Sequence, residues 1–452
     1  MIRRIAGLAF ATAVASYAPR AAADPIEFVE QRDQYMIFQD VSGELDDANW
    51  FMRDPFLAAF GDVEDGYLAA HADDSQFLIV YTTWSLPPPV GALYQSVAND
   101  VQGIGFEHIA PLDAVVPEPY FDDTPDSQLQ GFMHMNNWMN YLGDDAGGVD
   151  DSRISLVFGQ ELGHAWLAFV HWMDGNGTRS DMLGRAEAHW SFYMDAGPSP
   201  VEGHDWVDNG DGTFTAVKHD IFTFSELDLY LMGLAPAAAV APWFILENVT
   251  NCIDSALKDG SCAPPTGHTF AADSYTVTAT RREITIEDVI ASEGPRVPAF
   301  GDAPTEFDAS FVLITRPGER LSEEDKLQID TIIERSIDIW AQQTAGAGLV
   351  VNRTAAEDPS GGEDTDGGPG GADETGASDG GGGDDSPGGD AGTAGTGGSE
   401  NSTGATEGGA ASGDSDDGGC SCTTSSRGGT WALLGTVVFG LRRRRRPTRA
   451  RR

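Results

Sequence analysis

The chain has 452 residues, and its 27 lysines and arginines against 71 aspartates and glutamates give a formal net charge of −44. This charge argues against nucleic-acid binding, which needs a basic surface facing phosphates, and against electrostatic docking on anionic lipid as the main activity. Hydrophobic residues make up 40% of the chain, enough for a folded core, and four cysteines are too few for a disulfide-rich scaffold.

The first residues have the organisation of a secretory signal peptide. A basic start with Arg3 and Arg4 is followed by an apolar stretch and by the alanines of residues 21–23, which offer a cleavage site. We therefore assign residues 1–23 to a signal peptide and expect the chain to be exported. The globular part is expected over residues 24–354, a length that fits one large core or two lobes.

Two strands and a central helix are predicted in the first half of the globular part. Residues 76–84 and 131–136 are rich in β-branched, aromatic and other apolar side chains, which favour strands. The stretch from Ile154 to Met173 predicts a central helix. This mixture indicates an α+β fold.

The segment from Phe158 to Trp166 reads Phe-Gly-Gln-Glu-Leu-Gly-His-Ala-Trp and carries the residues with the clearest chemical role. In zinc hydrolases, His-Glu-x-x-His on a helix places two ligands at positions i and i+4 on one face, and the glutamate is the general base. Here Glu161 and His164 occupy the glutamate and second-histidine positions, whereas Gln160 replaces the first histidine. A neutral amide oxygen is a poorer zinc ligand than imidazole, so the site is either an altered metal site or a vestigial one.

Structural positions are expected for four further histidines. On the predicted helix His171 would lie about 10 Å along the axis from His164, too far for both to bind one ion, so it is assigned to packing. His134 is expected at an ordinary strand position, with a place in the lining of the pocket as the alternative. Solvated turns are expected for His204 and His219.

Two downstream segments complete a recognisable pattern. Residues 184–190 end in His189-Trp190, and residues 225–233 end in Leu-Met-Gly. Together with Gln-Glu-x-x-His, they resemble the metzincin-type metallopeptidases, and the leishmanolysin-like branch in particular. In that branch a third histidine is followed by tryptophan, and a methionine turn lies beneath the metal. The resemblance covers Phe158 to Gly233, less than a quarter of the chain.

The resemblance implies a zincin-like domain over residues 24–354 with a Zn²⁺ cofactor. It makes His164 and His189 metal ligands, Gln160 a substitute or vestigial ligand, and Met232 the supporting methionine. Glu161 would be the general base. Glu187 is an alternative third ligand, as in gluzincins, where a carboxylate completes the site.

The rest of the globular part is expected to contain further local structure. Residues 206–215 predict a hairpin, because Asn-Gly and Asp-Gly supply positive φ angles. Cys252 and Cys262 bracket a short loop and predict a disulfide in an exported protein, with free buried thiols as the alternative. Residues 311–315 predict a buried strand. Ser322 is expected to begin the last helix, with Asp325 near a capping-box position and an apolar face of Ile329, Ile332, Ile333, Ile337 and Trp340.

The C-terminal part of the chain, residues 355–452, has too few large apolar side chains to form a hydrophobic core. Residues 355–426 are Gly, Asp, Glu, Ser, Thr and Pro with almost no large apolar side chain, so we expect a disordered, self-repelling linker. Within residues 427–452, a short apolar run at 430–441 precedes an arginine cluster at 442–446. The run is shorter than the roughly 20 residues that a membrane span needs.

Cys420 and Cys422 lie just before this apolar run. The order of cysteines, short apolar run and arginine cluster resembles the myxobacterial C-terminal sorting signal (MYXO-CTERM). The resemblance implies processing near the cysteines by a sorting machinery and anchoring at the outer membrane or cell surface. A plain tail-anchoring transmembrane helix is the alternative.

The sequence therefore predicts an exported, surface-anchored zinc metallopeptidase homologue that acts on extracellular proteins or peptides. The alternative is a catalytically inactive pseudo-peptidase that serves as a surface binding or structural protein.

Overall fold

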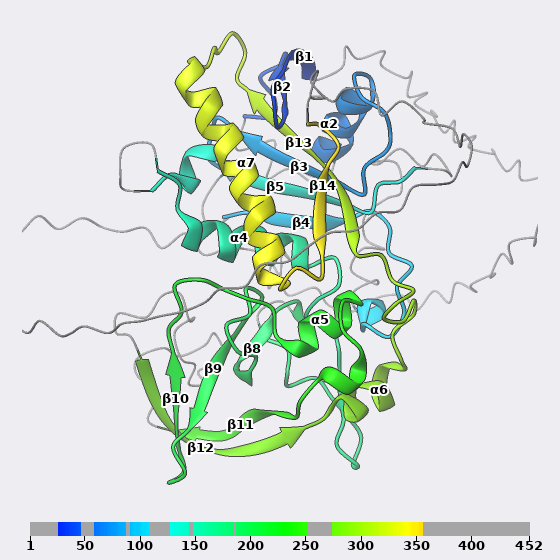
Figure 1. The fold of residues 1–452 in the computed structure, drawn as a ribbon, viewed down its shortest axis with the longest axis vertical. Coiled ribbons are helices and arrows are strands. Elements are labelled where there is room, and N and C mark those ends of the chain that lie inside the picture. Colours follow the sequence, from blue (N-terminus) through cyan, green and yellow to red (C-terminus); the bar gives the residue numbers. More distant parts are fainter. Residues whose placement is uncertain are drawn as a thin grey trace, which may run out of the picture.

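A computed structural model of the chain describes residues 26–46, 58–86, 91–108, 127–143, 148–184, 187–250 and 274–355. The predicted signal peptide, the acidic linker after residue 355 and the sorting segment lie outside the described residues, as do Cys252 and Cys262. Figure 1 shows two regions, an upper one built on a mixed sheet and a lower one built on a small barrel.

The upper region is organised around a seven-stranded sheet in the order β1-β2-β13-β3-β5-β4, with β14 paired to β13. The inner neighbours β2, β13, β3 and β5 run parallel, whereas β1 and β4 run antiparallel to the strands beside them. The strands are β1 (Ile26–Gln31), β2 (Met36–Asp40), β3 (Phe77–Thr82), β4 (Leu93–Ser96), β5 (Gly131–Asn137), β13 (Glu306–Thr315) and β14 (Leu349–Asn352).

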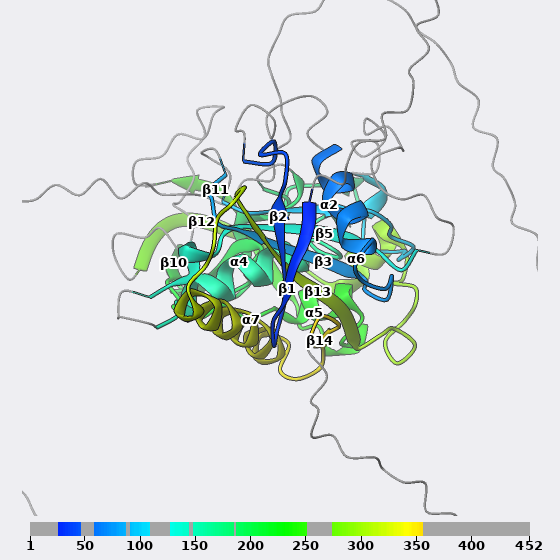
Figure 2. The ribbon, with the colours of Figure 1, turned by 90° about the horizontal axis from the view of Figure 1, so that it is seen from above.

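Helices cover both faces of this sheet. Helices α4 (Asp151–Gly163) and α7 (Glu323–Gln343) pack together on one face, and α2 (Ala58–Leu68) lies on the other, as Figure 2 shows. Successive strand residues point to opposite faces, so Phe77 and Ile79 of β3 join the core under α4 and α7, whereas Leu78 and Val80 join the core under α2. Every residue of β3 is buried, as expected for a central parallel strand.

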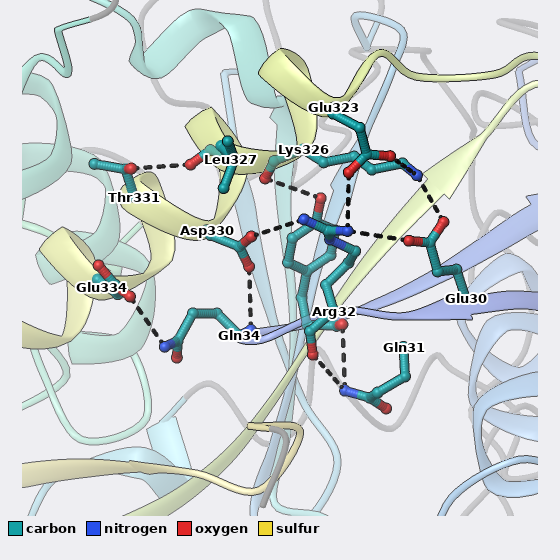
Figure 3. Close-up of polar contacts among 11 residues, drawn as sticks. Glu30, Gln31, Arg32, Gln34, Glu323, Lys326, Leu327, Asp330, Thr331 and Glu334 are labelled. Carbon is teal, nitrogen blue, oxygen red and sulfur yellow. Dashed lines mark hydrogen bonds and ion pairs between the residues drawn. The ribbon is translucent and has the colours of Figure 1, made fainter. Parts of the chain in front are cut away.

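A charged network joins the β1–β2 hairpin to α7 (Figure 3). The Arg32 guanidinium lies 3.1 Å from Glu30, 3.3 Å from Glu323 and 3.5 Å from Asp330. The Lys326 ammonium lies 2.7 Å from carboxylate oxygens of both Glu30 and Glu323. A single exposed pair contributes at most about 1 kcal/mol, so the shared network, rather than any one pair, fixes the hairpin on the helix.

The lower region is a closed barrel in the order β10-β12-β11-β8-β9. Its small core contains Trp206, Phe214 and Phe244. Helices α5 (Glu226–Met232) and α6 (Ile286–Glu293) flank it. The strands are β8 (Trp190–Asp195), β9 (Glu202–Asp208), β10 (Thr213–Val217), β11 (Trp243–Thr250) and β12 (Ser274–Ile284). Short elements are β6 (Trp172–Met173), β7 (Thr178–Arg179) and the 3₁₀ turns η1 (Phe106–His108), η2 (Trp138–Tyr141) and η4 (Ala237–Ala239).

Most local predictions are confirmed. The strands predicted at 76–84 and 131–136 are β3 and β5, and the predicted hairpin is β9–β10, with Gly210 and Gly212 at positive φ in its turn. Ser322 caps α7 through a reciprocal capping box with Asp325. The strand predicted at 311–315 is the end of a longer one, because β13 begins at Glu306.

The predicted extent of the central helix is wrong. Helix α4 ends at Gly163, His164 is its C-terminal cap, and the predicted last residues 172–173 form β6 instead. Ala168 has a φ of 66°, which no α-helix contains. Tertiary contacts replace the helical bonds, because the Asn99 amide donates to the Ala165 carbonyl at 2.8 Å.

The described residues thus combine helices and sheets in both regions. Their relation to the zincin fold stays a prediction. Among the described helices, none has both the length and the apolar character needed to cross a bilayer.

Candidate functional site

Helix α4 brings the Gln-Glu-x-x-His residues to its C-terminal end. Asp150 caps the N-terminus by accepting a bond from the Arg153 amide at 2.9 Å. At the other end the His164 amide donates to the Gln160 carbonyl at 3.1 Å, so these residues keep the i, i+4 relation although the helix stops there. Gln160, Glu161 and His164 are all buried.

His189 lies directly beside His164. Their ring centroids are 4.8 Å apart and the ring planes meet at 83°, and both residues are at most 3% exposed. The backbone fixes this position, because the Gly184 amide donates to the His189 carbonyl at 2.7 Å and the Trp190 amide donates to the Val201 carbonyl at 2.9 Å. The structure therefore brings together two of the predicted metal ligands from two separate regions of the fold.

Gln160 and Glu161 form a buried polar pair. The Gln160 side-chain amide donates to a Glu161 carboxylate oxygen at 3.2 Å. A buried carboxylate is costly unless hydrogen bonds compensate for the lost water, and Gln160 supplies one such bond. The amide oxygen of Gln160 remains the only atom of that side chain suited to binding a cation.

A glycine allows the two regions to approach each other at the end of α4. A Cβ added to Gly163 would lie 3.2 Å from a Val201 methyl carbon and 3.5 Å from the Phe224 ring. The 3.2 Å contact is tighter than nine in ten real Cβ contacts, so a larger residue would require Val201, which directly precedes β9, to shift by a few tenths of an ångström. Gly163 thus helps to hold His164 close to His189.

The residue after His189 is anchored to α5. The Trp190 indole donates to the Asp228 carboxylate at 2.8 Å, and Asp228 also forms the capping box of α5 with Ser225. Burial raises the pKa of Asp228, while the bonds from Ser225 and Trp190 act in the opposite direction.

Met232 is the last residue of α5 and is completely buried. Gly233 follows it as a left-handed cap with a φ of 85°. The buried Arg296 guanidinium donates to the carbonyls of Leu231 and Met232 at 2.7 and 2.8 Å, which satisfies the end of the helix. The predicted methionine turn is therefore a capped helix end within the core.

Glu187 is exposed and has a φ of 55°. Its charge acts on His171, whereas His189 is the residue that lies against His164. Of the two alternatives for a third ligand, the described geometry favours His189.

Sequence reasoning missed two buried titratable residues on β9. Glu202 and His204 are 5% and 2% exposed, so the prediction that His204 is solvated is wrong. His204 packs between the rings of Phe192 and Trp206, at centroid distances of 5.9 and 5.5 Å. The turn-rich sequence around them gave no sign of this burial, which arises from closure of the barrel. His219 remains partly exposed and pairs with Asp205 at 2.9 Å.

The donor set fits Zn²⁺ in part. Two adjoining buried imidazoles are ligands that zinc prefers. Within the described ranges, however, a compact group of three His, Cys, Asp or Glu ligands is found elsewhere. It consists of His108, His171 and Glu293, whose ligand atoms all lie within 4.8 Å of one another. The third ligand beside His164 and His189 would therefore be a residue of another type, and Gln160 is the predicted one.

Comparison of the chain with protein-family models, with curated proteins and with solved structures finds no significant match. Any functional assignment consequently depends on the residues themselves.

Proposed function

We propose that this protein is an exported, surface-anchored homologue of zinc metallopeptidases that acts on extracellular proteins or peptides. The observation that carries the proposal is the packing of His189 against His164 at the end of the helix that bears Glu161. Glu161, His164 and His189 follow one another along the chain in the order that the resemblance to metzincin-type metallopeptidases implies.

His164 and His189 would hold the metal through ring nitrogens, with the Gln160 amide oxygen as the third protein ligand. When bound, zinc would act as a Lewis acid toward a peptide carbonyl and lower the pKa of a bound water to about 7.

The protein's own groups would position and move the proton. Glu161 would accept the proton of the attacking water as general base. The Gln160 amide donates to one Glu161 oxygen at 3.2 Å and so helps to hold the carboxylate in place. The Trp190–Asp228 bond would keep His189 at its place beside His164.

A pseudo-peptidase is the second candidate, and the Gln160–Glu161 bond favours it. All four predicted site residues are at most 3% exposed, and a carboxylate that bonds to a neighbouring amide can be buried without a metal. In this case the domain would bind an extracellular partner without cleaving it.

The predicted segments at the two ends of the chain support the proposed location. The signal peptide would direct export, and the MYXO-CTERM-like segment would be read by the sorting machinery and anchor the domain to the outer membrane or cell surface. The net charge of −44 argues against nucleic acid as a partner.

Hydrolysis of a library of extracellular peptides by the full chain tests the proposal. In the active protein Glu161→Gln should lower the rate by about 100- to 10,000-fold, because it removes the general base. Glu64→Gln is the matched control, since Glu64 is also a buried carboxylate but lies on α2, on the opposite face of the sheet. Retained hydrolysis in Glu161→Gln would refute the role of Glu161. A folded protein without hydrolysis and without zinc at His164 and His189 would favour the pseudo-peptidase.

A further inference from the structure

Three segments far apart in the sequence place two histidines and a glutamate side by side. His108 ends η1, His171 lies after α4, and Glu293 ends α6. The imidazole rings of His108 and His171 are stacked, with centroids 3.9 Å apart and planes at 21°. Each of the three residues offers one ligand atom, and these atoms all lie within 4.8 Å of one another.

The carboxylate of Glu293 is held in a fixed orientation. Its Oε1 accepts bonds from the His171 backbone amide at 2.7 Å and from the Ser292 hydroxyl at 3.2 Å. Its Oε2 faces His108 Nε2 at 3.0 Å. The Glu293 side chain is 1% exposed, whereas that of His108 is 35% exposed, so the cluster is buried at the carboxylate and open at the imidazoles.

The backbone around the cluster is tightly packed. A Cβ on Gly105 would lie 2.4 Å from the Phe169 carbonyl oxygen, and a Cβ on Gly103 would lie 2.5 Å from that of Pro295. Gln102 and Val297 exchange two backbone bonds of 2.9 and 3.0 Å. The chain segments that carry His108, His171 and Glu293 are therefore in direct contact, and this backbone packing brings the three side chains together.

The surroundings favour a cation. The charges of Glu107 and Glu187 act on His171 in addition to that of Glu293. Burial and the neighbouring His108 act on His171 in the opposite direction and lower its pKa, so the cluster combines two imidazoles with nearby carboxylates.

We propose that His108, His171 and Glu293 form a binding site for a divalent transition-metal ion of the Zn²⁺ class. Imidazole nitrogen and carboxylate oxygen are zinc ligands at about 2.0–2.2 Å. The Oε2–Nε2 separation of 3.0 Å already suits two ligands of one ion, and rotation of the partly exposed His171 ring supplies the third. Hydrogen bonds to Oε1 orient the ligating carboxylate, as supporting residues do in metal sites.

This site shares no residue with the site at His164 and His189, so the proposal can be tested independently of the proposed function. A bound ion would link η1, the segment after α4 and the end of α6. It should therefore stabilise the folded chain, because an ion that binds only the folded state raises the free energy of unfolding.

Zinc titration of the full chain tests the proposal, with His164→Ala/His189→Ala as the background that removes the other predicted ligands. We expect one equivalent of Zn²⁺ to bind to this background variant and its melting temperature to rise with zinc and fall with a chelator. Binding of no zinc by the folded background variant would overturn the proposal. If this variant does not fold, the difference in bound zinc between the unmutated chain and Glu293→Gln gives the same test.

Glu293→Gln and His171→Asn should each weaken zinc binding by more than about 100-fold, beyond the effect of removing a supporting residue. Glu293→Gln retains an oxygen that can accept the His171 amide bond, so its fold should be kept. His219→Asn is the matched control, since it removes a histidine paired with a carboxylate, Asp205, that has no place in the three-residue cluster. Equal zinc affinity in Glu293→Gln and His219→Asn would refute the assignment.

Discussion

The indole of Trp190 donates a 2.8 Å hydrogen bond to the buried carboxylate of Asp228, and this bond joins the residue after His189 to the N-terminus of α5. The two residues come from different elements of the lower region. Through this bond the position of His189 depends on a helix cap that is remote from it in the sequence.

Trp190→Phe should lower the free energy of unfolding by about 2–3 kcal/mol, because the Asp228 carboxylate loses a charge-assisted bond in a buried position. Denaturant unfolding of the full chain measures this change. The substitution should also weaken zinc binding at His164 and His189, since His189 loses its anchor.

Trp206→Phe provides the comparison for this change. Trp206 is also buried, but its indole donates to the neutral Phe192 carbonyl at 3.0 Å, and we expect a loss of about 1 kcal/mol. A smaller loss for Trp190→Phe than for Trp206→Phe would show that the bond to Asp228 contributes no more to stability than a bond to a neutral carbonyl.

Gln160→His should raise the zinc affinity of the site at His164 and His189 by at least about tenfold, because an imidazole replaces a neutral amide ligand on the same helix face. Calorimetric titration in a Glu293→Gln background measures this site without a contribution from the cluster at His108. Gln160→Leu has a similar volume and no ligand atom, and it should show no gain. Unchanged affinity in Gln160→His would mean that the i, i+4 geometry is not one that zinc can use.

The buried imidazole of His134 should make the fold sensitive to acid. Burial lowers the pKa of His134 from 6.5 to about 4, and its Nδ1 accepts a bond from the Asn136 amide at 3.0 Å. Between these values the unfolded chain binds a proton that the folded chain does not, so stability is lost as the pH falls from about 6.5 to 4. The loss should approach about 3 kcal/mol. His134→Asn keeps an acceptor for the Asn136 amide, and its urea midpoint should depend less on pH in this window.

Asp195 should have the opposite effect on the same pH profile. Burial raises the pKa of its carboxyl from 3.8 to about 6, although the Trp206 amide bond lowers it. Between these values the folded chain holds the proton, so this residue makes stability fall as the pH rises from about 4 to 6. In Asp195→Asn stability should therefore rise more steeply with pH than in the unmutated chain. Parallel pH profiles of Asp195→Asn and His134→Asn would contradict both assignments.

Local patterns in the sequence predicted those elements that local chemistry determines. Ser322 and Asp325 cap α7 reciprocally, and Gly210 and Gly212 supply the positive φ angles of the β9–β10 turn. The end of α4 was not predictable in this way, because the residues after Gly163 contain no proline. Contacts from distant residues, such as the bond of Asn99 to the Ala165 carbonyl, compete with the helix there.

The early end of α4 also changes the position of His171. A helix extending to residue 173 predicts a packing position for His171, but the chain leaves the helix at Gly163 and brings His171 to His108 and Glu293. No sequence pattern links these three residues, since each comes from a different element. By contrast, Gln160, Glu161 and His164 were recognisable because their spacing lies within one helical turn.

Helices cover both faces of the central sheet, so the difference between a buried and a solvated face cannot set the register of its strands. A strand with one solvated face resists a one-residue slip, because the slip would expose its apolar side chains. In β3 and the end of β13 nearly all positions are apolar, so such a slip would exchange one buried hydrophobic side chain for another. Polar contacts at the start of β3 must then align the strands. The Ser310 hydroxyl meets those of Ser75 and Tyr67 at 2.5 and 2.7 Å, and Gln76 exchanges two hydrogen bonds with Asp308. These few hydroxyl and amide groups therefore fix the register of β3 against β13.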